Sequence, residues 1–336
     1  MSSEPLFTCR VTSREADLPL LAALSRRFPY YSEAEWQRLI SAGAVSVNGQ
    51  PAGPGQLLVI DDQIQTRISG YEEPPGPETL TTVYADDTFV LVEKPSGMPV
   101  SRTGRVITNT AINILRRQHD NPEMQLMHRL DRETSGLLLC VRDRQSCKRY
   151  QKHLSDIVAR KFYLAVVRGN IECNNKLVCF PLAEKVSSPV RCQMHVVQGG
   201  KKTATTLHTL AARDNASLLL VELHTGRKHQ IRAHLAHLGH PLFGDKIYSF
   251  GGHYFQARME RELTEADYQS LGAKYHTLHA WSMELRLPGQ PQSALFFAKE
   301  VSADMAKLLA LFPDWQQAAR KGLLKLGVSP VLPEKE

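Results

Sequence analysis

Two patterns of apolar and polar residues follow one another within the first 70 residues. Leu18–Leu24 and Glu33–Ser41 place apolar residues three and four apart, as amphipathic helices do, and Ser32 is positioned to cap the second helix. Ala44–Gly49 alternates apolar and polar residues and ends in Asn-Gly, which is typical of a strand entering a tight hairpin. Two later runs are further strand candidates, namely Leu57–Ile60 and Ile64–Ile68. The pattern predicts a small unit of helices and strands at residues 13–70.

Prolines and glutamates separate this unit from the rest of the chain. Residues 71–80 contain three Pro and three Glu, a composition that favours an extended, semi-rigid linker. The following residues, 81–300, are numerous enough to bury a core of their own. Residues 301–336 then form a C-terminal helical extension, which Pro313 divides into two stretches.

Strand-like runs outnumber helical ones within residues 81–300. Short apolar runs bounded by polar segments indicate buried strands at Phe89–Glu93, Leu137–Val141, Phe162–Val167, Leu177–Phe180, Cys192–Val197, Leu218–Leu223 and Met283–Leu287. Helical spacing is found at Asn109–Arg117, Gln145–Leu154, Gln230–Leu238, Ser302–Phe312 and Asp314–Leu326. This balance predicts an α+β domain built on a large mixed or antiparallel sheet.

The polar loop Met127–Gly136 carries the most informative chemistry. Its carboxylate Asp131 comes just before the apolar run Leu137–Val141. Burial raises the pKa of a carboxyl group unless a cation or a hydrogen-bond donor compensates. Asp131 is therefore either a structural residue that caps the Thr134–Gly136 turn or a functional carboxylate.

The stretch His128–Gly136 resembles the signature of the pseudouridine synthases, in particular of the RluA-type branch that modifies ribosomal and transfer RNA. It reads His-Arg-Leu-Asp, two variable residues and Thr-Ser-Gly. Four more segments match the family in the expected order: Glu93–Val100, Arg160–Gly169, His224–His234 and Leu278–Ala280. Residues 249–276, with a helical stretch at Thr264–Leu271, look like an insertion between two matched segments. The resemblance implies an enzyme that isomerises uridine in RNA to pseudouridine.

The resemblance also implies roles for three residues. Asp131 is the family's catalytic aspartate, which either attacks the anomeric carbon or removes a ribose proton. Arg232 is its expected partner because a guanidinium keeps its charge and offers a bidentate fork, although a phosphate contact is the alternative. Tyr163 is expected to stack on the extruded uracil and to assist removal of the proton from carbon 5, although its apolar strand also suits a core tyrosine.

Four further residues are expected to contact RNA by the same resemblance. Arg129 is expected to fill the gap that a flipped-out uridine leaves in the RNA stack. His128, Lys161 and Arg227 are expected at the same surface, His128 as a hydrogen-bonding residue rather than a general base. Five histidines between residues 224 and 240 suggest a metal site, but no carboxylate accompanies them at zinc-like spacing. We therefore expect no metal and no cofactor.

Charge favours an RNA partner for one part of the chain. Residues 101–170 hold 14 Lys and Arg against six acids, a surplus of +8 in a chain whose net charge is +7. Part of that surplus also suits solvated helix faces, such as residues 142–152. Residues 13–70 resemble the S4 RNA-binding module that often precedes these synthases. Residues 1–70, however, hold six Arg, no Lys and seven acids, which argues against strong RNA binding by that module.

The remaining features narrow the expected location, substrate and class of the protein. The six cysteines form no Cys-x-x-Cys pair, and neither a signal peptide nor a long apolar run is present, so we expect a cytoplasmic protein. A monomer is the default expectation for this architecture. An S4-like module favours ribosomal RNA over transfer RNA as the substrate. Two alternatives are a non-catalytic RNA-binding or ribosome-assembly factor on the same scaffold and a glycoside hydrolase, which needs two paired carboxylates.

Overall fold

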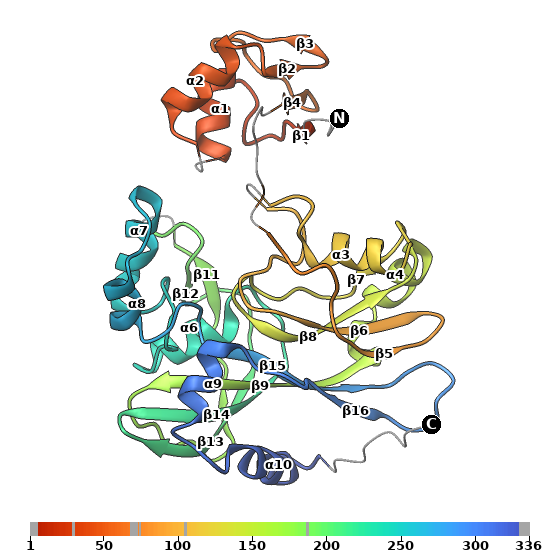
Figure 1. The fold of residues 1–336 in the computed structure, drawn as a ribbon, viewed down its shortest axis with the longest axis vertical. Coiled ribbons are helices and arrows are strands. Elements are labelled where there is room, and N and C mark those ends of the chain that lie inside the picture. The colour runs from red at the N-terminus through yellow and green to blue at the C-terminus, as the bar shows by residue number, and fades with distance from the viewer. Residues whose placement is uncertain are drawn as a thin grey trace. The chain divides into compact units, whose positions relative to one another are not determined.

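The computed structural model describes residues 6–28, 31–67, 73, 75–103, 106–185 and 188–328. The chain forms two compact units (Figure 1). The described residues within 1–75, together with those of Arg102–Thr108, make an N-terminal unit, and the others make a larger unit. The predicted linker at 71–80 is described only at residues 73 and 75–80.

The N-terminal unit packs two helices against a four-stranded antiparallel sheet of order β1-β4-β2-β3. Its elements are β1 (Leu6–Arg10), α1 (Leu20–Arg27), α2 (Glu33–Ser41), β2 (Val45–Val47), β3 (Gln50–Pro51) and β4 (Gln63–Arg67). Ser32 caps α2 in a reciprocal capping box with Glu35, as predicted. Asn48 and Gly49 both have positive φ, which confirms the expected hairpin turn.

Two predictions for this unit are wrong. Strand β1 precedes residue 13, so the unit begins earlier than the apolar pattern indicated. Leu57–Ile60 forms no strand: Leu58 is buried in the core, whereas Leu57, Val59 and Ile60 are exposed. A run of apolar residues indicates a buried strand only where neighbouring elements cover both of its faces.

The larger unit is built on a ten-stranded mixed sheet of order β10-β13-β14-β9-β15-β8-β6-β5, with β16 beside β15 and β7 beside β8. Its strands are β5 (Thr82–Ala85), β6 (Phe89–Lys94), β7 (Gln125–Leu126), β8 (Ser135–Val141), β9 (Val158–Arg168), β10 (Lys176–Val178), β13 (Thr205–Arg213), β14 (Ala216–Leu223), β15 (Leu278–Leu285) and β16 (Ala294–Phe297). A separate hairpin pairs β11 (Leu182–Glu184) with β12 (Met194–Val196). The predicted α+β architecture is confirmed.

Helices cover both faces of this sheet (Figure 1). They are α3 (Ala111–Gln118), α4 (Arg144–Gln151), α5 (Leu154–Ile157), α6 (Gln230–His237), the 3₁₀ turn η1 (Phe250–Gly252), α7 (His253–Glu260), α8 (Glu265–Leu271), α9 (Ala303–Leu309) and α10 (Trp315–Lys325). Core residues of α3 and α6 pack on the sheet face that carries Tyr163 and Ala165. Those of α9 and α10 pack on the opposite face, beside Phe162 and Leu164. The C-terminal helices are therefore part of this unit, and residues 329–336 of the predicted extension lie outside the described residues.

The sheet consists of two halves joined by a short seam. Strands β8 and β15 run parallel and share only two residue pairs, Ser135 with His279 and Gly136 with Ala280. Gly136 has a φ of 104°, and a Cβ atom there would collide with the backbone of Ala280. The Gly of the Thr-Ser-Gly motif thus allows the two halves to meet immediately after the Asp131 loop.

The structure also corrects several element predictions in the larger unit. Strand β13 was not predicted, and β15 begins five residues before the predicted start at Met283. The predicted strands at Leu177–Phe180 and Cys192–Val197 are shorter and correspond to β10 and β12. Helix α4 ends at Gln151 and a second short helix follows, where one helix was predicted.

Candidate active site

The loop between β7 and β8 presents Asp131 at the start of the seam. The buried Leu130 anchors its N-terminal side, and the N–H of Thr134 donates a hydrogen bond to the carbonyl oxygen of Asp131. The Asp131 side chain is 28% exposed. The carboxylate is therefore fixed by its surroundings and still accessible to a substrate.

Lys94 holds the backbone of this loop with a buried ammonium group. Its ammonium, 1% exposed at the end of β6, donates hydrogen bonds to the carbonyl oxygens of Pro95, Met98 and Arg132, at 2.8, 2.9 and 3.1 Å. Burial lowers the pKa of Lys94 to about 7, against the opposing attraction of Asp131. Lys94, in the motif that begins at Glu93, thus connects the backbone at Pro95 and Met98 to the loop that carries Asp131.

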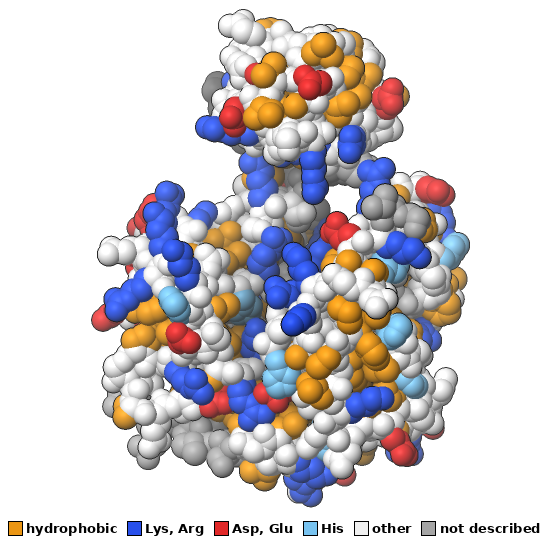
Figure 2. All heavy atoms as spheres, turned by 180° about the vertical axis from the view of Figure 1, so that it is seen from behind, with side chains coloured by type: hydrophobic (Ala, Val, Ile, Leu, Met, Phe, Trp, Pro, Cys, Tyr) orange, Lys and Arg blue, Asp and Glu red, His pale blue; other side chains and the backbone are white. Residues whose placement is uncertain are grey.

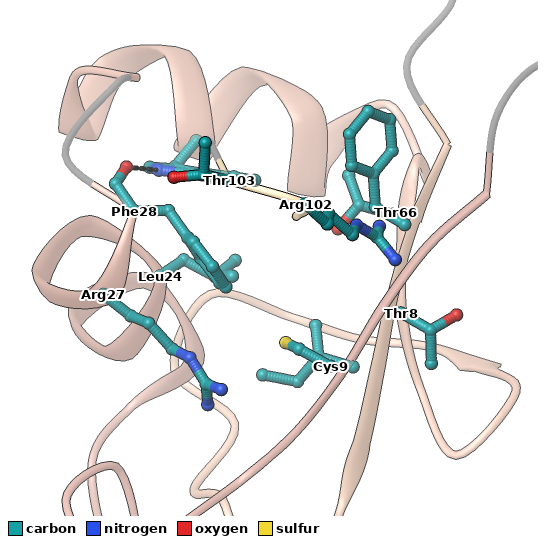
Figure 3. A pocket seen from close by; sticks show the side chains of 11 residues that line it. Thr8, Cys9, Leu24, Arg27, Phe28, Thr66, Arg102 and Thr103 are labelled. Atoms are coloured by element: carbon teal, nitrogen blue, oxygen red, sulfur yellow. Dashed lines mark hydrogen bonds between the residues drawn. The ribbon is translucent and has the colours of Figure 1, made fainter. Parts of the chain in front are cut away.

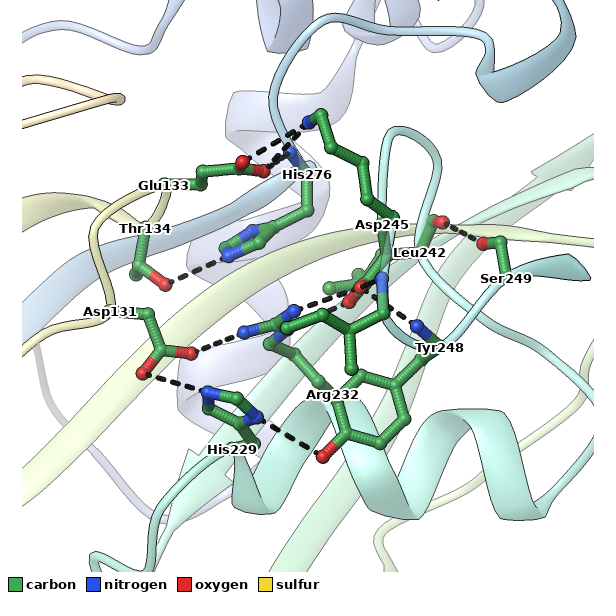
Figure 4. A network of polar contacts seen from close by, with 12 residues as sticks. Asp131, Glu133, Thr134, His229, Arg232, Leu242, Asp245, Tyr248, Ser249 and His276 are labelled. Carbon is green, nitrogen blue, oxygen red and sulfur yellow. Dashed lines mark hydrogen bonds and ion pairs between the residues drawn. The ribbon is translucent and has the colours of Figure 1, made fainter. Parts of the chain in front are cut away.

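Arg232 lies between two carboxylates (Figure 4). Its Nη1 donates to Oδ2 of Asp131 at 2.8 Å, so the contact expected from sequence is present. The bidentate fork, however, is directed to another residue: Nε and Nη2 donate to the two oxygens of Asp245, at 2.7 and 2.9 Å. The Asp245 side chain is fully buried, and its Oδ1 also accepts the N–H groups of Ile247 and Tyr248. Asp245 therefore holds Arg232 in place, and one remaining N–H group reaches Asp131.

The charges of this cluster stabilise one another. Burial opposes ionisation of Asp131, but the Arg232 guanidinium overcomes it and keeps the pKa of Asp131 below its usual value. Burial likewise opposes the charge of Asp245, yet Arg232 holds its pKa well below the usual range. The two carboxylates in turn raise the pKa of Arg232 despite its burial. At neutral pH the cluster thus holds two anions and one cation.

A neutral histidine faces the second oxygen of Asp131. Nε2 of His229 lies 3.9 Å from Asp131 Oδ1, and its Nδ1 lies 3.2 Å from the hydroxyl of Tyr248 (Figure 4). That hydroxyl accepts the N–H of Met194, so its own proton is available to Nδ1. Burial, with Arg232 nearby, lowers the pKa of His229 to about 4. The ring is therefore neutral at pH 7, and its Nε2 faces Oδ1 of Asp131.

A second ion pair fixes the other end of the loop. Lys246 donates to both oxygens of Glu133 at 3.1 Å, and the backbone N–H of His276 also donates to this carboxylate. Nε2 of His276 lies 3.4 Å from the Thr134 hydroxyl, and burial lowers the pKa of this histidine to about 4. The variable position before Thr134 therefore anchors the loop to residues 244–276 (Figure 4).

Tyr163 lies on β9, between Val221 of β14 and Ala280 of β15. Its side chain is buried on the sheet face covered by α3 and α6. Burial raises the pKa of Tyr163, and the negative charge of Asp131 raises it further. The Asp131 carboxylate thus acts electrostatically on the Tyr163 hydroxyl. The phenol is therefore protonated at neutral pH.

The residues expected to contact RNA differ in their surroundings. Arg129 is exposed, and its guanidinium makes no hydrogen bond or ion pair with another residue that the structure describes. Arg227 is also exposed, and its Nε donates to the carbonyl oxygen of Lys202 at 3.3 Å. Lys161 lies two residues before Tyr163 on β9, close to Gly226, and burial lowers its pKa.

His128 has a structural hydrogen bond. Its Nε2 accepts the N–H of Leu139 in β8 at 3.0 Å, and burial, with Lys161 nearby, lowers its pKa to about 4. This agrees with the hydrogen-bonding role given to it from sequence, whereas its contact with RNA stays a prediction.

The histidines between residues 224 and 240 take part in separate contacts. His224 lies 2.8 Å from the hydroxyl of Thr206, His234 lies 3.0 Å from the carbonyl oxygen of Phe180, and His240 lies 2.9 Å from that of Arg168. Within the described ranges, no group of three or more His, Cys, Asp or Glu residues is arranged to hold a metal ion.

A pocket of about 230 Å³ lies in the N-terminal unit (Figure 3). Its lining includes Cys9, Leu24, Arg27, Phe28 and Arg102. It contains none of the predicted site residues, so the chemistry assigned above belongs to the larger unit alone.

Comparison with known proteins identifies the family of the chain. The family model for RNA pseudouridylate synthases matches residues 88–237, and that for the S4 domain matches residues 18–64. The chain is 30% identical over 274 residues to an uncharacterized RNA pseudouridine synthase of Synechocystis sp., a match that covers 80% of this chain and 94% of the relative. It is also 30% identical over 305 residues to ribosomal large subunit pseudouridine synthase D of Neisseria meningitidis serogroup A, covering 86% and 77%.

One solved structure supports the fold. Human RNA pseudouridylate synthase domain containing 4 aligns with a TM-score of 0.50 and 21% identity, covering 69% of this chain and 93% of that one. The chain belongs to the RNA pseudouridine synthase family, and it is an enzyme that isomerises uridine in RNA to pseudouridine. The S4 resemblance of the N-terminal unit is confirmed as well. Within the part of the chain that the structure describes, no helix has the length and apolar character needed to cross a membrane.

Proposed function

We propose that Asp131 is the catalytic carboxylate of this enzyme and that its substrate is ribosomal RNA. The observation that carries the first part is the ion-paired but accessible state of Asp131, whose partner Arg232 is itself fixed by Asp245. The second part is supported by the similarity to a synthase named for the large ribosomal subunit and by the S4 domain.

The reaction needs no external reagent. The bond between N1 of uracil and C1′ of ribose breaks, a bond between C5 and C1′ forms, and the proton of C5 is replaced by one on N1. Asp131, ionised at neutral pH, either attacks C1′ or removes a ribose proton, and both routes use the same charged oxygen. Because Arg232 already occupies Oδ2, we assign the reacting role to Oδ1, which faces His229.

Two more residues complete the proposal. The ring of Tyr163 stacks on the uracil after the nucleotide leaves the RNA stack, and its protonated hydroxyl stays close to the reacting base. Arg129, exposed in the same loop as Asp131, fills the gap left in the RNA. We further propose that the enzyme acts as a monomer and that it is cytoplasmic, and its six free cysteines support the second of these.

Transcriptome-wide pseudouridine mapping tests this proposal. Cells that lack the protein are complemented with the wild type or with Asp131→Asn. We expect a ribosomal uridine that is modified with the wild type alone. Equal restoration by both proteins would refute the role of Asp131, and modification confined to transfer RNA would refute the assigned substrate.

A further inference from the structure

Helix α4 uses one face to pack and leaves the other exposed. Cys147 and Tyr150, with Leu154 just beyond the helix, pack against the core cluster of β6 and β8, and the Tyr150 ring lies 5.2 Å from that of Phe89. The outer positions Arg144, Lys148, Arg149, Gln151 and Lys152 are all exposed. The outward face is thus available for contact with a partner.

The exposed face is strongly cationic. Arg144, Lys148 and Lys152 follow one another at intervals of four residues and form a stripe along the helix, with Arg149 beside it. Arg144 pairs with Glu123 at 3.0 Å, whereas Lys148, Arg149 and Lys152 have no carboxylate oxygen within 4.0 Å among the described residues. Figure 1 places α4 at the right-hand border of the larger unit. In Figure 2, which is turned by 180°, this border lies on the left, and Lys and Arg side chains gather along it. Like charges at this spacing repel one another, so the stripe gains from an anion outside the chain.

Helix electrostatics alone do not account for the stripe. A helix dipole favours cations in the last turn, which suits Lys148 and Arg149. The same dipole disfavours a cation in the first turn, where Arg144 lies. Compensation of the dipole at the helix C-terminus would explain Lys148 and Arg149 but not Arg144. An extended anion that runs along the whole helix would explain all three.

The geometry suits a phosphate backbone. Four residues of helix rise by about 6 Å, which is comparable to the separation of neighbouring phosphates along a nucleic-acid strand. Lys148, Gln151 and Lys152 also line a shallow hollow of about 310 Å³, which combines one amide with two ammonium groups. An amide and two ammonium groups together can donate hydrogen bonds to phosphate oxygens.

The surface lies apart from the site of chemistry. Asp131 precedes the start of β8, and α4 follows its end, so the seven residues of this strand separate them by roughly 20 Å. RNA that reaches both places would contact the enzyme beyond the target nucleotide.

We propose that the stripe Arg144, Lys148 and Lys152 binds the phosphate backbone of the substrate RNA at a distance from the target uridine. This rests on the proposed role of Asp131 as the site where that uridine reacts. The stripe contributes affinity without touching the reacting atoms, so its loss raises KM and leaves kcat unchanged.

Charge reversal tests this inference. The double variant Lys148→Glu, Lys152→Glu is assayed on ribosomal RNA from cells that lack the enzyme, and its binding to a fluorescein-labelled RNA hairpin is measured in parallel. We expect KM and Kd to rise by about tenfold or more, with kcat preserved. The slope of log Kd against log salt concentration should become shallower by about 1.4 to 1.8, as two lost phosphate contacts require.

Matched controls separate this effect from others. Lys321→Glu, Lys325→Glu reverses two exposed charges at the same spacing on α10, and Lys148→Arg, Lys152→Arg keeps the charge on α4. Both controls should bind like the wild type. Equal weakening by the α10 variant, or an unchanged Kd for the α4 reversal, would overturn the inference. A wild type that binds the hairpin but leaves the ribosomal RNA unmodified would instead refute the proposed substrate.

Discussion

The two units of this enzyme distribute charge in opposite ways. The core of the N-terminal unit is apolar, with Leu20, Trp36 and Ile40 at its centre, and its pair Glu15–Arg27, at 3.1 Å, joins a buried carboxylate to a partly exposed arginine. The larger unit buries Arg232 and Asp245 together in its interior. All thirteen histidines also lie after residue 118. Buried charges are costly unless paired, so their concentration in one unit marks where the chemistry occurs.

Replacement of Arg232 should have the largest effect on activity. In Arg232→Lys a single ammonium cannot hold Asp245 with a fork and reach Asp131 as well. We expect kcat to fall by at least about 100-fold. Pseudouridine formation on ribosomal RNA measures this, and a thermal melt alongside separates catalytic loss from unfolding. Activity close to that of the wild type would show that one contact suffices.

Removal of Asp245 sharpens the comparison in terms of stability. Asp245→Asn leaves Arg232 without its bidentate carboxylate in a fully buried position, and we expect a loss of about 3–5 kcal/mol of unfolding free energy. The control is Glu15→Gln in the N-terminal unit, which keeps a hydrogen-bond acceptor and whose partner Arg27 is 28% exposed, so it should cost less than Asp245→Asn. Urea unfolding of both variants gives the two values. Equal losses would contradict the contrast between the units.

The pH dependence of stability should also reflect the larger unit. Burial lowers the pKa of His128, His229, His276 and His279 to about 4 each. Between pH 6.5 and 4 the unfolded chain binds protons that the folded site does not, so the unfolding free energy falls as pH falls. Each histidine contributes a slope that approaches about 1.4 kcal/mol per pH unit. Urea midpoints across this window should show the slope, and His279→Gln should make it shallower by one such contribution.

The smallest effect is expected in the N-terminal unit. Ser32→Ala removes the capping box at the start of α2 and should cost about 1 kcal/mol. Ser32→Asn, which retains a capping oxygen, should restore most of that loss. The kcat for pseudouridine formation should stay unchanged, because the change lies outside the unit that holds Asp131. A lower kcat would show that the two units are coupled in catalysis.

Local signals in the sequence predicted helices and turns well. Glu33–Ser41, its cap at Ser32 and the Asn48–Gly49 turn all follow from neighbouring residues, and the structure confirms them. Strand β13 was missed because Thr205–Arg213 mixes polar and apolar residues, and it is buried through its place within the sheet. Burial by distant elements leaves no such local pattern.

The site was only partly predictable for the same reason. The contact between Asp131 and Arg232, 101 residues apart, was anticipated from a family resemblance rather than from spacing. Asp245 was missed because it lies in an irregular loop without periodicity. The available signal was an acid next to a glycine in the largely apolar segment Leu242–Ile247. The αL backbone at Gly244 permits this loop, since a Cβ atom there would collide with Tyr275.

The two-residue seam between β8 and β15 has a mechanical consequence. A long ladder of hydrogen bonds holds two strands firmly together, whereas two residue pairs hold them less firmly. Few backbone hydrogen bonds therefore join the two halves along the line where the Asp131 loop enters the sheet. Small rotations of one half against the other change the distance between Asp131, which enters β8, and Tyr163, which belongs to β9. The relative placement of Asp131 and Tyr163 thus depends on a junction two residue pairs long.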